Sequence, residues 1–532
     1  GIRMAQTWWP AYYYFKDSPE FGVDAQVRML RSFRDHAHYL MNEDYFHVTS
    51  NWGAMEANGL FHIGVMLPEM SEAEQWRRVA QERLVAAQQE QIYPDGAQTE
   101  LTPGYHGVTL GNFLGSLEMA RRNDLELPVE FVAGLEKMFE YYMAVVMPDG
   151  RLPALNDSGW GSARSMLARG AKLFPDRGDF VYLSTDRKQG GVPERTSWRL
   201  PYAGWNIMRT GWEADDKYLL FETGPFGSGH QHEDKLGVIL YAGEKRILTE
   251  AGTYSYDTSE WRKYVLSTRA HNTVMVDGLE QRRGHRPETR VVREPEDTPW
   301  HTSVEFDFAE GTYRSGYGQE NEVEVEHKRQ VLFVKPDYWI VVDEMLPGDD
   351  DEHSYEAMFH LDADEAHVDA ETQAVTVEHE GGAFRIIPFG PRTVEVEIVS
   401  GQTDPVVQGW LPTGRHNELR AIPTAVFRWR SAGRSVMAFA LVPRDRDEEW
   451  CVAQVTSSRD LGPGSVAAEL TLRDGQVDLF ARGLAGDSTA TAGRLVTDAD
   501  VALARLDEAG NVIRTVQIGG SEVRVLPESG GE

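Results

Sequence analysis

The spacing of the apolar residues changes near residue 197 of this 532-residue chain, and this change constrains the fold most strongly. Before it, apolar side chains recur about every 3.6 residues, which predicts amphipathic helices. After it they alternate along short stretches, which predicts strands. We therefore expect an α+β multidomain protein, with a helical domain over residues 1–196, a central antiparallel β-sandwich over 197–450 and a C-terminal β-sheet region over 451–532.

Proline, glycine and aspartate turns divide both parts into short elements. The predicted helices cover residues 24–42, 53–66, 72–91, 105–122, 129–147 and 162–174. The predicted strands include residues 217–222, 236–241, 273–276, 331–343, 383–388, 394–399, 425–429 and 436–441. Six helices of similar length suggest stacked helical hairpins, and many successive short strands indicate an antiparallel sandwich.

The net charge of −31 argues against general binding of nucleic acid or of an anionic membrane, because so acidic a surface repels polyanions. A polyanionic ligand would need a local basic cleft. The single cysteine, Cys451, excludes an intrachain disulfide and a thiolate cluster, so histidine and carboxylate must hold any metal. No run of 18 apolar residues occurs, and we expect no membrane-spanning helix.

Histidines and carboxylates are unusually dense between residues 227 and 272. If the strands at 236–241 and 246–249 form a hairpin, Glu250 returns beside His232. His271 heads the next strand, which can pair alongside. Two imidazoles and one carboxylate could take three positions of a tetrahedral zinc shell. In an extended segment His230 faces the same side as His232 and could approach a substrate; alternatively, these histidines are satisfied by hydrogen bonds within a sheet.

A second group of polar residues lies at helix starts. Asn51 precedes an apolar helix, and Tyr105 and His106 follow Glu100 at the start of another, where side chains project from the end of the element. Taken alone, Asn51 is typical of a helix N-cap and Tyr105 of a packing residue. Only a spatial relation between them would indicate a site.

Aromatic residues form a third group, which includes Trp52 and Trp160. Sugar rings stack on such faces, although aromatic runs also build cores. Arg209 could supply a local positive field within this negatively charged protein. Alternatively, it forms a salt bridge at the surface.

Several ordered motifs resemble the heparinase II/III-like polysaccharide lyases, a family that includes alginate and oligoalginate lyases. They are SNWGAMEANGL, YPDGAQTELTPGYH, RLPALNDSG, NIMRTGW, GSGHQHEDKLGVILYAGEKRILTEAGTYSY and STRAHNTVMVDG. The resemblance spans about residues 46–362. It implies an N-terminal (α/α) toroid followed by antiparallel β-sandwich layers, with the active site between them.

The resemblance also implies a metal site. His232, Glu250 and His271 fall where the family places one structural divalent metal, zinc, with Glu250 in place of the more usual aspartate. Because glutamate is longer than aspartate, we expect the geometry of the metal site or its affinity for the metal to differ. We expect the metal to stiffen the sheet that presents His230.

Catalytic roles can be carried over in the same way. Asn51 matches the asparagine that neutralises the substrate carboxylate, Tyr105 matches the catalytic tyrosine, and His230 matches a histidine near the reacting sugar. Several alginate-active relatives have histidine after that asparagine, where Trp52 stands here. Either His106 or His230 takes over the role of that histidine, or the substrate differs from that of the alginate-active relatives.

The family's second tyrosine lies between the metal carboxylate and the last metal histidine. Tyr264 is the preferred match, with Tyr256 next and Tyr254 as a further competitor. We assign Trp52, His106, Arg209, Trp160 and Glu100 to substrate binding.

The implied reaction is β-elimination in a uronic-acid polymer, alginate or a glycosaminoglycan such as heparan, giving 4,5-unsaturated ends. It requires a neutralised carboxylate, a base at C5 and an acid at the glycosidic oxygen. The alternatives are a noncatalytic carbohydrate-binding protein and a glycoside hydrolase that uses Asp157, Asp95 or Glu100.

Six helices make only about half of the family's toroid, so we expect either that the chain lacks an N-terminal helical region of the full gene product or that its toroid is unusually open. The resemblance further predicts a secreted or periplasmic protein that acts on an acidic polysaccharide or oligosaccharide. A homodimer is an open alternative to a monomer.

Overall fold

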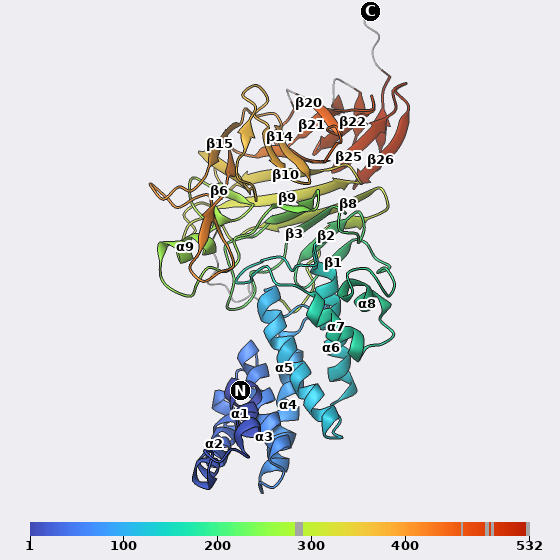
Figure 1. Cartoon of the computed structure of the whole chain (residues 1–532). Helices are drawn as coiled ribbons and strands as arrows, with labels where there is room; N and C mark the ends of the chain where they lie inside the picture. The colour runs from blue at the N-terminus through green and yellow to red at the C-terminus, as the bar shows by residue number, and fades with distance from the viewer. Residues whose placement is uncertain (282–290, 459–460, 485–488, 491–493, 528–532) are drawn as a thin grey trace, which may run out of the picture.

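The computed structural model describes residues 1–281, 291–458, 461–484, 489–490 and 494–527. Helices occupy the N-terminal part of the chain and strands most of the rest (Figure 1). The helices are η1 (Arg3–Trp8), α1 (Trp9–Phe15), α2 (Val23–Met41), η2 (Glu43–Tyr45), α3 (Asn51–Met66), α4 (Ala73–Gln91), α5 (Pro103–Arg122), α6 (Val129–Val145), α7 (Arg164–Leu173), α8 (Gly178–Ser184), α9 (Glu260–Leu266) and η3 (Thr268–Ala270).

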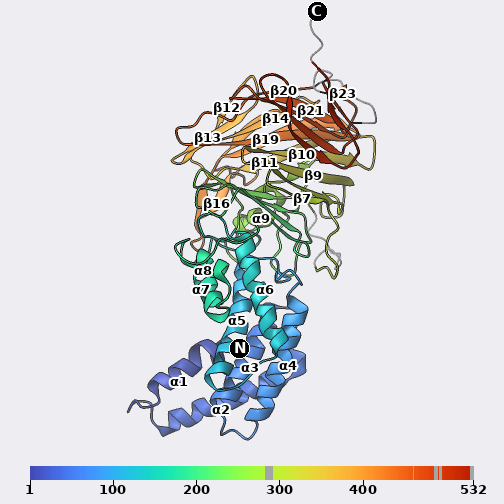
Figure 2. The ribbon, with the colours of Figure 1, turned by 90° about the vertical axis from the view of Figure 1, so that its right-hand side faces the viewer.

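The N-terminal helices form an open stack that stands against one side of the sheets (Figures 1 and 2). Helix α3 packs against α2, α4 and α5, and the stack continues through α6 and α7 to α8. All six predicted helices are confirmed, with ends that differ by one or two residues. The sequence did not predict η1, η2, η3, α1, α8 and α9, because aromatic-rich or very short segments show too few turns to reveal a period.

Antiparallel strands follow from residue 198. They are β1 (Trp198–Leu200), β2 (Trp205–Arg209), β3 (Tyr218–Glu222), β4 (Val238–Ala242), β5 (Lys245–Leu248), β6 (Val274–Val276), β7 (Trp300–Thr302), β8 (Phe306–Tyr313), β9 (Val325–Val334), β10 (Tyr338–Pro347), β11 (Glu352–His360), β12 (His367–Val368), β13 (Val375–His379), β14 (Gly382–Phe389), β15 (Glu395–Val399), β16 (Trp410–Pro412), β17 (Leu419–Ala421), β18 (Thr424–Ala432) and β19 (Ser435–Asp445). The C-terminal strands are β20 (Val452–Ser457), β21 (Val466–Leu472), β22 (Val477–Arg482), β23 (Thr489–Ala490), β24 (Leu495–Thr497), β25 (Val501–Leu506), β26 (Val512–Ile518) and β27 (Val523–Val525).

In the described part of the chain the strands form layers. A five-stranded sheet has the order β1-β2-β3-β4-β5, and an eight-stranded sheet has the order β12-β13-β14-β19-β10-β9-β8-β7. A four-stranded sheet has the order β15-β18-β11-β6, and β16 pairs with β17. The C-terminal strands form a five-stranded sheet, β20-β21-β22-β25-β26, and a three-stranded sheet, β23-β24-β27.

The eight-stranded sheet is apolar on both faces. Along β9, Val331 and Phe333 pack into one core with β3, β4 and β18, whereas Leu332 and Val334 pack into another with the C-terminal sheet. Because successive strand residues point to opposite faces, a strand between two cores reads as a continuous apolar run. The sheet is therefore the middle layer of the β part (Figure 2).

Two sequence predictions about strands are wrong. The single strand at 331–343 is two strands, because the chain turns after Val334, where Asp337 N–H donates to the Val334 carbonyl at 2.8 Å. Pro336 lies in this turn, and its missing N–H suits a position outside the ladder. Strand β6 pairs with β11 rather than beside the β4–β5 hairpin. Asn272 still joins that hairpin, because its amide donates to the carbonyls of Val238 and Thr249, both at 2.8 Å.

A buried arginine ties the histidine-rich segment to the middle sheet. The Arg329 guanidinium donates to both carboxylate oxygens of Asp343, at 2.6 and 2.9 Å, and to the carbonyls of Leu236 and Asn272. His327 also contacts Asp343 at 2.7 Å. Burial acts to raise the pKa of Asp343, but Arg329 and His327 outweigh it and lower that pKa to about 2. The carboxylate is therefore ionised and paired inside the protein.

Replacing Asp343 should destabilise the fold. Asp343→Ala leaves the Arg329 charge buried without its partner, which costs about 3–5 kcal/mol in comparable buried pairs. Chemical denaturation measures the change in the free energy of unfolding. The matched control is Glu82→Gln, which removes an exposed ion pair with Arg78 and should leave stability unchanged. Equal stability of Asp343→Ala and the wild type would contradict this interpretation.

Candidate active site

A pair of tyrosines lies where the helices meet the sheets. Tyr105 is held at the start of α5, where Thr102 Oγ1 accepts a hydrogen bond from its backbone N–H at 3.0 Å. Its hydroxyl lies 2.7 Å from that of Tyr256. Its ring stacks on the imidazole of His230, with ring centroids 3.6 Å apart. Because Tyr256 is 63% exposed, a ligand can reach the pair from solvent.

The Tyr256 hydroxyl holds its proton firmly. Partial burial is the largest cause that raises the pKa of Tyr256. The hydrogen bond with Tyr105 and the negative charge of Asp157 raise it further. The guanidinium of Arg262, 5.1 Å from the ring centroid, acts in the opposite direction. Two phenols in contact also resist losing both protons, because the second charge would form beside the first. Tyr256 is therefore protonated at neutral pH and can serve as an acid.

Glu100 fixes Asn51 beside this pair. The Asn51 side-chain amide donates to both Glu100 oxygens at 3.0 Å, and its backbone N–H donates to Oε1 at 2.9 Å. Glu100 Oε2 also lies 3.6 Å from His230 Nε2. Asn51 and Glu100 are both buried. The carboxylate thus orients the amide and contacts the imidazole, and it is not open to bind sugar directly.

Asp157 connects the two histidines of the HQH motif. Its Oδ2 lies 3.1 Å from His230 Nδ1 and its Oδ1 lies 3.1 Å from His232 Nε2. Arg262 donates to both oxygens, to Oδ2 at 2.8 Å. Burial acts to raise the pKa of Asp157, but the hydrogen bonds from His230, His232 and Arg262 outweigh it and hold that pKa below its usual range. Asp157 is therefore a buried anion with three cationic or polar partners.

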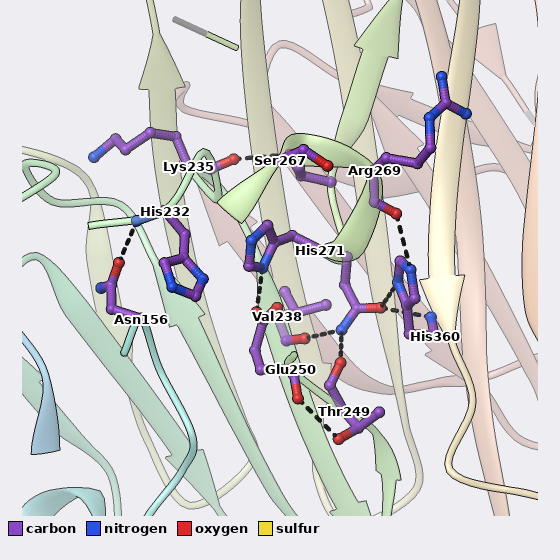
Figure 3. Close-up of polar contacts among 12 residues, drawn as sticks. Asn156, His232, Lys235, Val238, Thr249, Glu250, Ser267, Arg269, His271 and His360 are labelled. Carbon is purple, nitrogen blue, oxygen red and sulfur yellow. Dashed lines mark hydrogen bonds and ion pairs between the residues drawn. The ribbon is translucent and has the colours of Figure 1, made fainter. Parts of the chain in front are cut away.

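The predicted metal ligands lie behind this carboxylate. The rings of His232 and His271 face each other with centroids 5.3 Å apart, and His271 Nδ1 contacts Glu250 Oε2 (Figure 3). Burial raises the pKa of Glu250 to about 8, against the opposing effects of His232 and two backbone donors. Burial also lowers the pKa of His232. Burial thus disfavours the charged forms of Glu250 and His232.

The donor atoms fit a divalent metal in kind and in burial. Within the described residues, His232 Nδ1, Glu250 Oε1 and both carboxylate oxygens of Asp234 are buried without a hydrogen-bond partner. Imidazole nitrogen and carboxylate oxygen are zinc ligands. No three histidine, cysteine, aspartate or glutamate side chains in that part of the chain are gathered closely enough to hold an ion as they stand. Binding would therefore require these side chains to move together.

The structure does not bring three predicted residues to the site. His106 is buried, its Nε2 contacts the Met138 carbonyl at 3.0 Å, and burial lowers its pKa to about 3. Arg209 is buried and donates to the carbonyls of Ala144 and Val146. Tyr264 is buried, and its hydroxyl donates to the Trp410 carbonyl at 3.2 Å. These side chains are held by packing and backbone contacts, and Tyr256, not Tyr264, contacts Tyr105.

The two predicted tryptophans lie apart from the tyrosine pair. Trp52 is 57% exposed and lines a surface groove of about 740 Å³ with Tyr39 and Met55. Trp160 is half-buried, and the Arg246 guanidinium lies 3.7 Å from its ring centroid. Trp52 follows Asn51 directly and can extend the site along the surface, whereas Trp160 is covered by a cation.

The central position of Asp157 was not foreseen. The sequence suggests Asp157 only as a carboxylate of the glycoside-hydrolase alternative. A signal did exist in RLPALNDSG, where three polar residues interrupt an apolar stretch between turns. Such an interruption indicates buried polar contacts or a site.

Two family models match the chain. The model described as Heparinase II/III N-terminus matches residues 1–182, and the one described as Heparinase II/III-like, C-terminal matches residues 192–420. The chain belongs to the heparinase II/III-like family. This family membership confirms the resemblance seen in the motifs, and the matches extend beyond both ends of the residues that carried it.

Two curated relatives of this heparinase II/III-like chain are named heparin-sulfate lyase. The protein from Pedobacter heparinus is 26% identical over 347 residues, covering 63% of this chain and 50% of the relative. The protein from Bacteroides stercoris is 27% identical over 414 residues, covering 75% of this chain and 57% of the relative. The chain thus spans about half the length of the curated relatives it matches.

Solved structures share the fold. A mutant of heparan sulfate lyase HepC from Pedobacter heparinus has a TM-score of 0.73 at 23% identity, covering 90% of this chain and 73% of that one. A structure of heparinase III has a TM-score of 0.74 at 18% identity, covering 87% and 72%. The likeness confirms the α+β multidomain fold. In the described part of the heparinase II/III-like chain, no helix has the length and apolar character needed to cross a membrane.

Proposed function

We propose that this protein is a glycosaminoglycan lyase that cleaves a heparan-type polymer by β-elimination. The observation that carries the proposal is the solvent-accessible contact between the Tyr105 and Tyr256 hydroxyls, with His230 stacked on Tyr105. The relatives named heparin-sulfate lyase support the same substrate class. Secretion or a periplasmic location, and a homodimer, stay predictions.

The residues present match the needs of the reaction. Asn51 and His230 would bind the uronate carboxylate, which makes the C5 proton more acidic. Tyr105, or His230 if Asn51 alone binds the carboxylate, would then remove that proton, the electron pair would form the C4–C5 double bond, and the C4–O bond would break. Tyr256, which keeps its proton at neutral pH, would protonate the departing oxygen. No water is consumed.

The hydrolase alternative has little support from the carboxylates. Asp157 is paired with Arg262 and two histidines, and Glu100 is committed to Asn51. Asp95 accepts hydrogen bonds from the backbone N–H groups of Tyr202 and Ala203 at 2.8 and 3.1 Å. A glycosidase needs one carboxyl group at the leaving oxygen and a second at the sugar or its water. These three side chains are occupied in other roles.

The function can be tested by a product screen. Heparan sulfate, heparin, chondroitin sulfate, hyaluronan and alginate are each incubated with the protein, and ultraviolet absorbance reports 4,5-unsaturated uronate. We expect absorbance to rise on heparan sulfate. No rise on any polymer would overturn the proposal, and a rise on alginate alone would overturn the substrate assignment.

Variants of the tyrosines provide the matched control for this screen. Tyr105→Phe and Tyr256→Phe each remove one hydroxyl of the exposed pair and should lower kcat by about 10²-fold or more, as loss of a general acid or base does. Tyr264→Phe removes a buried hydroxyl that contacts Trp410 and should keep kcat while lowering the melting temperature. Substrate binding without turnover, unchanged in Tyr105→Phe, would instead favour a noncatalytic carbohydrate-binding protein.

We further propose that His232, Glu250 and His271 hold one structural divalent metal, zinc. The support is the buried His232 Nδ1 and Glu250 Oε1, which lack hydrogen-bond partners among the described residues. When bound, the metal would supply charge that keeps Glu250 ionised and would link the HQH segment to η3. Its part is structural, because the tyrosine pair lies on the other side of Asp157.

Metal content and stability should fall together in His232→Ala. Elemental analysis by mass spectrometry should give about one zinc per wild-type chain and much less in the variant, and the variant should melt at a lower temperature because a site that binds only the folded state stabilises it. His36→Ala, at a part-buried histidine on α2, is the control. Full zinc content in His232→Ala, or none in the wild type, would contradict the assignment.

A further inference from the structure

The loop formed by Asn156, Asp157 and Ser158 joins the helices to the sheets. The Asn156 amide donates to the Leu101 carbonyl at 3.1 Å, and its oxygen accepts the backbone N–H of His232 at 2.7 Å. Ser158 Oγ accepts the backbone N–H of Gly104 at 3.0 Å. Asn156 adopts a φ of 52°, a left-handed conformation that asparagine tolerates well. The loop is therefore fixed from both sides.

We propose that Asp157 is a positioning residue that sets the orientation of His230 for catalysis. The proposal rests on the proposed lyase function, and it assigns Asp157 no contact with substrate. The Asp157 side chain is 1% exposed. Each of its two oxygens contacts a different histidine. Oδ2 contacts His230 Nδ1 and Oδ1 contacts His232 Nε2, and the Arg262 guanidinium donates hydrogen bonds to both oxygens.

This arrangement fixes the His230 ring in two ways. The Asp157 contact directs its Nδ1 edge inward, and stacking on Tyr105, with an interplanar angle of 14°, sets the plane of the ring. The Nε2 edge then faces Glu100 at 3.6 Å, beside the Asn51 amide. Without Asp157 the ring keeps its aromatic contacts and the longer contact with Glu100, but no group holds its Nδ1 edge, and the ring can rotate about its side-chain bonds.

The carboxylate is itself held in place by Arg262. A guanidinium that donates two parallel hydrogen bonds fixes the plane of a carboxylate, which a single-point cation such as lysine does not do. Arg262 belongs to α9, whose start is capped by Ser259 Oγ. The same short helix follows Tyr256 in the chain. The path of α9 therefore positions Tyr256, and it also positions Arg262 so that its guanidinium binds Asp157.

Asp157→Asn should lower kcat and leave KM almost unchanged. We expect kcat to fall about 10- to 100-fold with KM changed less than about threefold, because displacement of a catalytic group by about 1 Å has effects of this size. The control is Asp95→Asn, which alters another buried carboxylate that joins helices to sheets. It should lower the melting temperature and keep kcat at temperatures where it is folded. An unchanged kcat in folded Asp157→Asn would overturn the inference.

A double-mutant cycle tests whether Asp157 acts through His230. In a His230→Ala background, Asp157→Asn should lower the residual rate by less than about threefold, because the group it positions is already gone. The full single-variant loss in that background would contradict the inference.

Arg262→Lys offers a milder variant if Asp157→Asn does not fold: kcat should fall about three- to tenfold at constant KM, and an unchanged kcat would count against the proposal.

A crystal structure of Asp157→Asn gives a readout that does not depend on turnover. The His230 ring should leave its stacked position on Tyr105 or occupy more than one orientation. A single, stacked His230 ring in the variant would overturn the inference even if the wild type is an active lyase. A displaced ring in a protein that cleaves none of the screened polymers would support the inference while the proposed function fails.

Discussion

A buried carboxylate links the helical part to the β part beside the tyrosine pair. Asp157 comes from a loop of the helical part, and its three side-chain partners, His230, His232 and Arg262, come from the β part. An isolated buried charge is very unfavourable, so this anion is stable only when all its partners are in place. The contact therefore favours one local arrangement of helices against sheets, and the Asn156 side-chain oxygen, which accepts the His232 backbone N–H, adds to it.

This constraint separates two roles within a short segment. On the solvent side of Asp157, His230 stacks on Tyr105 and the Tyr256 hydroxyl completes the pair. On the buried side, His232 faces His271, which contacts Glu250. His232 presents Nε2 to Asp157, and its buried Nδ1 has no hydrogen-bond partner among the described residues. Arg329 supports the same segment from the middle sheet by binding the carbonyls of Leu236 and Asn272.

Periodicity was sufficient to predict the long helices α2 to α7 and strands such as β3, β4 and β14, because these depend on local patterns. It could not predict which side chains meet. Tyr105 and His106 are neighbours on a helix, about 100° apart around its axis, so only one of them can face the sheets, and the choice depends on packing against α6. Tyr264 and Tyr256 were separated by the path of α9, which packs Tyr264 against Trp410. Arg209 was misassigned because the carbonyls that bind it, at the end of α6, are remote in sequence. The single strand at 331–343 was wrong because an apolar run does not reveal a tight turn within it.

In the proposed lyase the tyrosine pair performs an elimination rather than a hydrolysis. Cleavage of heparan sulfate in ¹⁸O-labelled water tests it most directly, because hydrolysis adds a water oxygen to each cleaved bond and elimination adds none. Mass spectrometry of the oligosaccharides should show an unsaturated uronate at the new non-reducing end and no ¹⁸O at the new reducing end. One ¹⁸O per cleavage, with saturated ends, would contradict the account.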